Sequence, residues 1–182
     1  PANSYQKAGG VADSPEDALR YLAHHVGNRL DRDKAKAFVS TASRMLDTFE
    51  REGFVSYSPA LTWADYHPDE PGGAQGGRSL CPDEFDGRKL GAWFAKLRPP
   101  IKTMTVFGGM MVGRNDLPHV YAMTRSTRSA MHVAGMLARQ ARDRVSFARG
   151  TRLVNGNALI ASMAASAFAR GVQLWLKTPV TE

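Results

Sequence analysis

The residues best suited to chemistry lie in one loop, ADYHPDEPGGAQGGRSL, at positions 64–80. Trp63, Tyr66 and His67 stand here among prolines and four glycines, and Arg78 follows where hydrophobic residues return. Glycines this close together raise the entropy cost of folding, so they indicate a backbone that turns sharply or approaches another group closely. The loop could line a pocket for a flat apolar ligand, with the Tyr66 hydroxyl as its polar group. It could equally be anchored to its own core by Trp63 and Tyr66, and spacing alone leaves both interpretations open.

The sequence contains no other pattern typical of a catalytic or metal site. His24 and His25 are neighbours on a predicted helix, where they point about 100° apart and do not easily share one ion. The other histidines are scattered and no H-E-x-x-H motif occurs, so no metal is expected. Cys81 has no histidine near it in sequence, which favours a buried or idle thiol over a nucleophile. None of the glycine-rich stretches matches a phosphate-binding motif.

Composition indicates a globular protein of one domain or slightly more. The chain has 182 residues, of which 43% are hydrophobic and 23% charged. No apolar run approaches the roughly 18 to 20 residues that span a bilayer, and no secretory signal opens the chain. A single cysteine cannot form an internal disulfide, which fits a reducing compartment, and we expect a cytoplasmic protein. The first residue is Pro1 and the last Glu182, which we interpret as an internal segment of a longer protein.

The net charge of +7 comes largely from an arginine-rich stretch in the second half of the chain. Such a stretch can mark an anionic partner such as nucleic acid or a phosphate-bearing cofactor, but it is more often a solvated helix face. We therefore regard nucleic acid as an unlikely partner. The residues concerned are Arg125, Arg128, Arg139, Arg142, Arg144, Arg149 and Arg152.

Two helices are predicted in the first third of the chain. Ser14 is a suitable N-cap with Pro15 at the first helical position, and Gly27 ends this first helix. A second helix runs to Gly53, and FVSYS after it is a candidate strand. The spacing of apolar residues in the second helix predicts a buried stripe of Ala35, Phe38, Val39, Ala42, Met45, Leu46 and Phe49.

The second half is also predicted to be mainly helical. KLGAWFAKLRPP is expected to be a short helix, and a long helix should run from Ser126 to Phe147. A last helix is expected with Asn155 or Asn157 as its cap and Gly171 as its terminator, and VQLWLKT after it is expected to be a buried strand. Small residues should form the inner face of the long helix, namely Ala130, Ala134, Leu137, Ala141 and Val145.

Three stretches, taken in order, resemble the FAD-dependent 3-ketosteroid Δ1-dehydrogenases of the wider fumarate-reductase-type flavoprotein family. PANSYQKAGGVADSPEDALRYL resembles the segment after that family's first nucleotide-binding unit, and DYHPDEPGGAQGGRSL is the most specific match. The third stretch is RGTRLVNGNALIASMAASAFARGVQLWLKTPV. The resemblance covers nearly the whole chain and is weakest from Leu97 to Arg144.

The resemblance implies an enzyme that removes hydrogens from C1 and C2 of a 3-ketosteroid or a similar apolar ketone, with the hydride passing to FAD and the proton to a tyrosine. By motif position, Tyr66 would be a supporting tyrosine near the substrate rather than the base. His67 stands where the family often has another aromatic residue. Asn3 would lie near the flavin, and the backbone of Val180 would face the adenine of FAD.

The resemblance also implies the fold: an α+β, mostly helical fragment, made of an insertion plus one helix–strand unit of a FAD-binding α/β domain. Residues 1–147 would be the helical segment that carries the loop at 59–82, and residues 148–182 the helix–strand unit. The glycine fingerprint, the base tyrosine and the ketone-binding segment are expected outside the chain. By itself the chain should neither hold FAD tightly nor catalyse a reaction, and its exposed core surface should make it self-associate. The alternative is a small basic helical module that binds nucleic acid or protein without catalysis.

Overall fold

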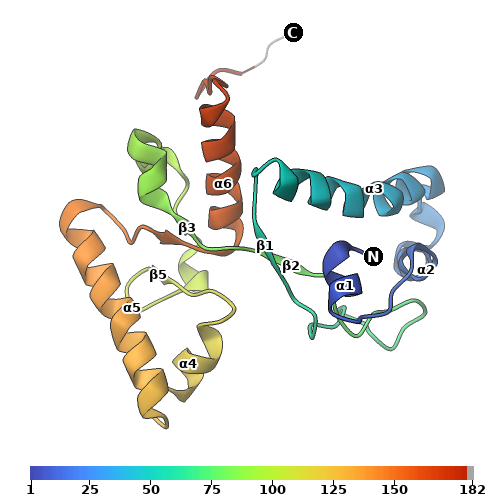
Figure 1. Ribbon diagram of the computed structural model, residues 1–182, viewed down its shortest axis with the longest axis horizontal. Coiled ribbons are helices and arrows are strands. Elements are labelled where there is room, and N and C mark those ends of the chain that lie inside the picture. The colour runs from blue at the N-terminus through green and yellow to red at the C-terminus, as the bar shows by residue number, and fades with distance from the viewer. Residues whose placement is uncertain (180–182) are drawn as a thin grey trace. The chain divides into compact units, whose positions relative to one another are not determined.

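The computed structural model describes residues 1–179 and divides the chain into two compact units, Pro1–Pro82 and Asp83–Glu182 (Figure 1). Within these residues, helices predominate and the strands form short antiparallel pairs, so the predicted α+β, mostly helical fold is confirmed. None of the helices built from residues 1–179 has the length and apolar character needed to cross a bilayer. The predicted division at 147/148 stays a prediction about the parent fold.

Side-chain caps begin the main helices of unit 1. Ser14 Oγ accepts a hydrogen bond from the Asp17 backbone N–H, and Pro15 is the first helical residue, both as predicted. Gly27, with φ of +61°, ends this helix as predicted. The helices of the unit are α1 (Ser4–Ala8, capped by Asn3), α2 (Pro15–Val26), the 3₁₀ helix η1 (Gly27–Arg29) and α3 (Arg32–Arg51, capped by Asp31).

Helix α3 buries a narrower stripe than its sequence predicts. Val39 and Leu46 are 4% and 3% exposed, whereas Phe38 and Met45 are 66% and 47% exposed. The prediction that all of the stripe is buried is therefore wrong for Phe38 and Met45. The physical reason is that the packing partner α2 covers only one edge of the apolar face. The other edge lines an open cavity between α2 and α3.

A strand pair holds together the two ends of the glycine-rich loop. Strand β1 (Tyr57–Pro59) pairs antiparallel with β2 (Leu80–Pro82), so that Ser58 lies opposite Cys81. The strand expected in FVSYS, residues 54–58, is thus present, but it begins at Tyr57 and ends at Pro59. Cys81 is a free thiol of intermediate exposure.

Unit 2 has a compact core built on its last long helix. Leu153 is 1% exposed and Ala158 and Ala161 are fully buried, and they pack with Leu90 and Phe94. Trp93 stacks on Phe168 at a centroid distance of 5.1 Å, which extends this core toward the end of the helix. The elements are β3 (Phe85–Asp86), the 3₁₀ helices η2 (Gly87–Lys96) and η3 (Lys102–Met104), β4 (Thr105–Val106), β5 (Met110–Met111), α4 (Leu117–Ala122), α5 (Thr127–Ser146), β6 (Arg152–Leu153) and α6 (Asn155–Ala169).

Two antiparallel pairs order the loops of unit 2. Phe85 of β3 lies opposite Leu153 of β6, which places β6 directly before α6 in the core. Thr105 of β4 lies opposite Met111 of β5 in a tight hairpin.

The short helix and the two long helices of this half occur where the sequence predicts them. The cap expected at Asn155 or Asn157 is wrong, because the N-cap of α6 is Val154. The two asparagine amides donate instead to the carbonyls of Val112 and Arg98, respectively.

The prediction for the inner face of α5 is wrong, because the helix buries a different face. Ala130, Ala134 and Ala141 are exposed, and so is Val145, at 86%. The buried positions are Ser129, Val133 and Asp143. Asp143 Oδ2 accepts hydrogen bonds from both the backbone N–H and the hydroxyl of Thr151, each at 2.8 Å. A satisfied buried carboxylate thus fixes the orientation of the helix, which apolar spacing alone does not reveal.

The strand expected in VQLWLKT is also wrong for the described residues. Residues 172–178 have no strand conformation, and Val172, Trp175 and Leu176 are 56%, 72% and 50% exposed. A strand needs a neighbour for its backbone N–H and C=O groups, and none of the strands found in residues 1–179 pairs with this segment. Helix α6 does end before Gly171, whose φ is +77°, as predicted. Val180 lies outside the described residues.

Candidate functional site

The loop of unit 1 is held by one arginine that bonds two carboxylates. Arg78 donates from Nη2 to Asp13 Oδ1 at 2.7 Å and from Nε to Asp13 Oδ2 at 3.0 Å. Its Nη1 donates to Asp65 Oδ2 at 2.7 Å. The Asp13 side chain is 1% exposed, and those of Arg78 and Asp65 are each 13% exposed. This bidentate geometry fixes both the distance and the orientation of the loop relative to the segment before α2.

The charges of this network are stabilised in their ionised forms. Burial alone would raise the pKa of Asp13, but the hydrogen bonds from Arg78 and Gln6 outweigh it and hold the pKa below its ordinary value. The hydrogen bond that Arg78 donates to Asp13 raises the pKa of Arg78. Breaking either partner would leave a buried charge without compensation.

Asn3, the predicted flavin-side residue, connects α1 to the loop. It is 5% exposed, and its Oδ1 accepts from the Gln6 backbone N–H at 2.9 Å. Its Nδ2 donates to Gln6 Oε1 at 3.0 Å and to the Gly77 carbonyl at 3.1 Å. The side-chain amide is therefore fully used inside unit 1, and its demonstrated role is to cap α1 and hold the loop.

The glycines of the loop are required by close packing on protein backbone. A Cβ on Gly72, whose φ is +80°, would lie 2.2 Å from the Asp17 carbonyl oxygen of α2. A Cβ on Gly76 would lie 1.8 Å from the Leu61 carbonyl oxygen. The close approach that the sequence predicts is thus an approach to α2 and to the loop's own chain.

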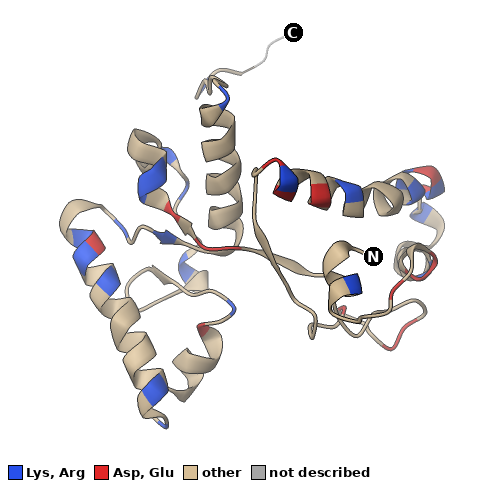
Figure 2. Ribbon diagram, in the orientation of Figure 1, with Lys and Arg blue, Asp and Glu red and all other residues tan. Residues whose placement is uncertain are grey.

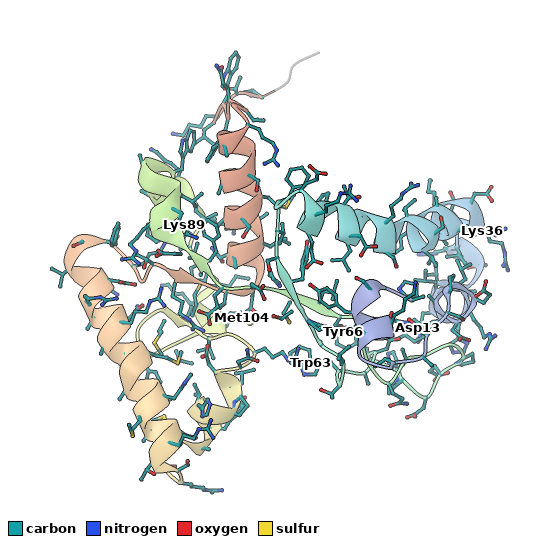
Figure 3. The ribbon with its side chains drawn as sticks, in the orientation of Figure 1. Asp13, Lys36, Trp63, Tyr66, Lys89 and Met104 are labelled. Carbon is teal, nitrogen blue, oxygen red and sulfur yellow. The ribbon has the colours of Figure 1, made fainter. Side chains whose placement is uncertain are left out.

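Tyr66 projects from this fixed loop into solvent. Its side chain is 98% exposed, and no partner for its hydroxyl occurs among residues 1–179. Figure 3 labels it with Trp63 on the same loop of unit 1. Tyr66 therefore does not anchor the loop to its core, and that interpretation is wrong for this residue. The arrangement presents a phenol on a rigid base, with its donor and acceptor available to a ligand.

Histidines that are far apart in sequence meet beside Tyr66. The rings of His25 and His67 stack at a centroid distance of 5.0 Å, and His24 Nε2 lies 2.9 Å from Glu70 Oε2. The His67 backbone N–H donates to the Tyr21 hydroxyl at 3.3 Å. In the described part of the chain, no group of three His, Cys, Asp or Glu side chains is arranged to hold a metal ion. These contacts dock the loop on α2.

A cavity of about 290 Å³ opens between α2 and α3. Phe38 and Met45 of α3 and Tyr21 of α2 contribute to its apolar wall. Asn3, Asp65 and Arg78 also line it and supply polar groups. The volume is at the small end of ligand sites, which run from about 300 Å³ upward, and suits one ring system. Tyr66 does not line this cavity, although the neighbouring Asp65 does.

Sequence reasoning missed most residues of this cavity. The apolar spacing of α3 places Phe38 and Met45 in the core, and no local pattern marks Tyr21 as a cavity residue. The available signal was the width of the apolar face of α3, which exceeds what one neighbouring helix covers. The pairing of Arg78 with Asp13 spans 65 positions and has no local signature.

A sequence model of the FAD binding domain family matches residues 1–182. The chain is 33% identical to a 4-oxocyclohex-2-ene-1-carboxylate 5-dehydrogenase of Sinomonas cyclohexanicum, over all of this chain and 30% of that protein. It is 27% identical to a 3-oxosteroid 1-dehydrogenase of Comamonas testosteroni, over all of this chain and 32% of that protein. The chain therefore spans about a third of the length of these relatives.

A solved structure has the same fold over almost the whole chain. It is the 3-ketosteroid delta1-dehydrogenase from Sterolibacterium denitrificans in complex with 1,4-androstadiene-3,17-dione. The TM-score is 0.81 at 27% sequence identity, and the match covers 97% of this chain and 31% of that one. The similarity thus includes the glycine-rich loop and both units, each within a larger chain.

Proposed function

The chain belongs to the FAD-binding domain family, and we propose that the whole protein is an oxidoreductase that dehydrogenates a cyclic ketone, a 3-ketosteroid or a similar apolar ring, between C1 and C2. The observation that carries the proposal is the structural match over 97% of the chain to an enzyme with a steroid ligand. The named relatives support it, since each is a dehydrogenase of a ring ketone. A basic binding module without catalysis is not favoured, because the family match leaves no part of the chain outside it.

The reaction removes a proton from C2, next to the carbonyl, and a hydride from C1, and forms a C1–C2 double bond. FAD, when bound, accepts the hydride. The proposed role of Tyr66 is to donate a hydrogen bond that supports the tyrosine that takes the proton. An exposed hydroxyl on a loop fixed by Arg78 suits this role, because positioning must be set before the substrate arrives.

The described residues fit the edge of a flavin site rather than its phosphate cradle. The cavity beside Asn3 is too small for a dinucleotide, and its apolar wall suits a ring of the substrate rather than the cofactor. The Asn3 Nδ2 already donates hydrogen bonds to Gln6 and to Gly77. Asn3 would therefore position the surrounding backbone near the flavin rather than donate a hydrogen bond to the flavin itself. The proposal further includes the Val180 backbone near the adenine and a cytoplasmic location. It also includes residues 148–182 as a helix–strand unit of the FAD domain, in which 172–178 become a strand only where the rest of the whole protein supplies a neighbouring strand.

The proposed role of Tyr66 is tested in the whole protein with Tyr66→Phe, which removes only the hydroxyl. Loss of one hydrogen bond that acts on the transition state should lower kcat by about 10- to 100-fold. Tyr121→Phe is the matched control, since Tyr121 is also largely exposed, at 80%, and lies on α4. Both variants should keep the wild-type melting temperature. Unchanged kcat in Tyr66→Phe would overturn the role, and equal losses in both variants would show that the effect is not specific.

A further inference from the structure

Unit 2 contains a second pocket, of about 210 Å³, that the proposed reaction does not use. It lies between the β4–β5 hairpin and the segment that leads from the end of α5 into β6. Four cationic side chains line it, namely Lys102, Arg144, Arg149 and Arg152. Among the described residues, no carboxylate belongs to the lining. Such a lining attracts anions.

Arg149 supplies a fixed positive charge. Its Nη2 donates to the carbonyl oxygens of Leu97 at 2.9 Å and Phe94 at 3.1 Å, and its guanidinium lies 4.7 Å from the centroid of the Phe94 ring. All of these partners are neutral, and no carboxylate within residues 1–179 pairs with it. Burial lowers the pKa of the Arg149 guanidinium. A bound anion would compensate this charge.

Arg152 is the second fixed guanidinium. Its Nη2 and Nε bond Glu84, and Nη2 also lies 2.8 Å from Asp116 Oδ2, so the side chain is held from one side. Its Nη1 is buried and has no hydrogen-bond partner among the described residues. A buried donor without a partner is costly, and it is a common sign of a group that bonds a ligand or water.

Lys102 and Arg144 are exposed, and no ion pair involves them in the part of the chain that the structure describes. They come from η3 and from the last turn of α5, where Lys and Arg recur along the helix (Figure 2). Gly108 and Gly109 form the hairpin turn with φ of +78° and +104°, so this wall has no side chain. Two exposed cations therefore line the pocket beside the glycine turn.

We propose that this pocket binds a small organic carboxylate whose apolar body rests against the pocket wall. Pro99, Pro100, Met111 and Leu153 provide apolar lining beside the cations. A bare inorganic anion would leave these surfaces unused, whereas a carboxylate on a ring or short chain would cover them. The proposal is independent of the redox function and stands whatever reaction the whole protein performs.

Binding is tested on the intact protein by isothermal titration calorimetry with cyclohexanecarboxylate, with its neutral amide and with inorganic phosphate. The carboxylate should bind saturably, whereas the amide should not. Added salt should lower the affinity for the carboxylate. Equal binding of the amide would overturn the proposal. Tighter binding of phosphate than of the carboxylate would overturn the assignment of the ligand class.

The site is located with variants of its exposed cations, which are not needed for the fold. Lys102→Met and Arg144→Met should each raise the dissociation constant for cyclohexanecarboxylate about tenfold, as expected for loss of one charged contact. Arg128→Met, at an exposed position of the same helix α5 but outside the pocket lining, is the charge-matched control and should bind like wild type. Equal affinities of Arg144→Met and Arg128→Met for the carboxylate would contradict its placement in this pocket. Melting temperatures of both variants confirm that they are folded. Because no turnover is measured, this outcome is separate from that of Tyr66→Phe.

Discussion

Arg78 binds Asp13 through two nitrogens, with Nη2 at 2.7 Å and Nε at 3.0 Å, although 65 positions separate them in sequence. The same guanidinium reaches Asp65, which lies one residue before Tyr66. The position of the exposed tyrosine is thus set by a nearly buried ion pair.

Asp13→Asn should destabilise unit 1 substantially. The substitution keeps the shape of the side chain but leaves Arg78 with one carboxylate, and breaking a buried pair costs about 3 kcal/mol or more. Urea unfolding followed by circular dichroism measures the change. Asp69→Asn, at an exposed position of the loop, should leave the midpoint unchanged. A midpoint for Asp13→Asn equal to that of the control would show that the pair does not hold the loop.

The same pair predicts acid sensitivity. The pKa of Asp13 is lower in the folded chain than in the unfolded chain, so folding is favoured above the ordinary pKa of about 4. This contribution is lost as the pH falls through the lower, folded pKa. Stability measured in urea between pH 6 and pH 2.5 should therefore fall toward acid, and less steeply in Asp13→Asn. Parallel curves for the two proteins would refute the assignment of this sensitivity to Asp13.

Gly72→Ala should be more harmful than Gly10→Ala. Both glycines have positive φ, at +80° and +67°, so both changes carry a backbone cost of about 1 to 2 kcal/mol. Only at Gly72 does the new Cβ also collide with backbone, 2.2 Å from the Asp17 oxygen, whereas nothing lies within 4 Å at Gly10. Thermal unfolding of the two variants measures the difference. Similar melting temperatures would mean that the loop can leave α2 without cost.

Two neighbouring residues of α3 that both line the cavity should differ in their effect on stability. Val39→Ala should cost about 2 kcal/mol of unfolding free energy, because Val39 is 4% exposed. Phe38→Ala should change stability little, since the ring is 66% exposed, but should weaken a ring-shaped apolar ligand of the cavity it lines. Equilibrium binding of a 3-ketosteroid and urea unfolding provide the two measurements. Ligand affinity unchanged in Phe38→Ala would exclude this cavity as the ligand site.

The chain produced by itself should self-associate. Val172, Leu174, Trp175 and Leu176 are each about half exposed or more, and an exposed apolar segment of this kind favours association. Light scattering should give a mass that rises with concentration, and Trp175→Lys should reduce the rise. A concentration-independent monomer would contradict this prediction.

Local signals in the sequence were sufficient to predict several helix ends, although not the N-cap of α6. Ser14, Pro15, Gly27 and Gly171 act through the few residues next to them, and the structure has each where the sequence indicates. The family could be predicted from the order of motifs, of which the loop around Tyr66 is the most specific.

Features that depend on distant partners could not be predicted. The buried face of α5 is fixed by Asp143 bonding Thr151, and the expected strand at 172–178 needs a neighbour that the described residues do not provide. The candidate site also depends on distant partners, because the network of Arg78 and the cavity at Phe38 join segments far apart in sequence. The pocket lined by Lys102 and Arg144 and the cavity lined by Phe38 exist only in the packed structure, so no local pattern in the sequence predicts them.

The most direct test of the central claim is anaerobic mixing of the whole protein with a 3-ketosteroid, followed in a stopped-flow spectrophotometer. The account predicts that flavin absorbance is bleached in a single turnover and that mass spectrometry finds a product lighter by two hydrogens. Tyr66→Phe should slow the bleaching, while Tyr121→Phe should not. A flavin that stays oxidised with the ketosteroid and with other ring ketones would contradict the account.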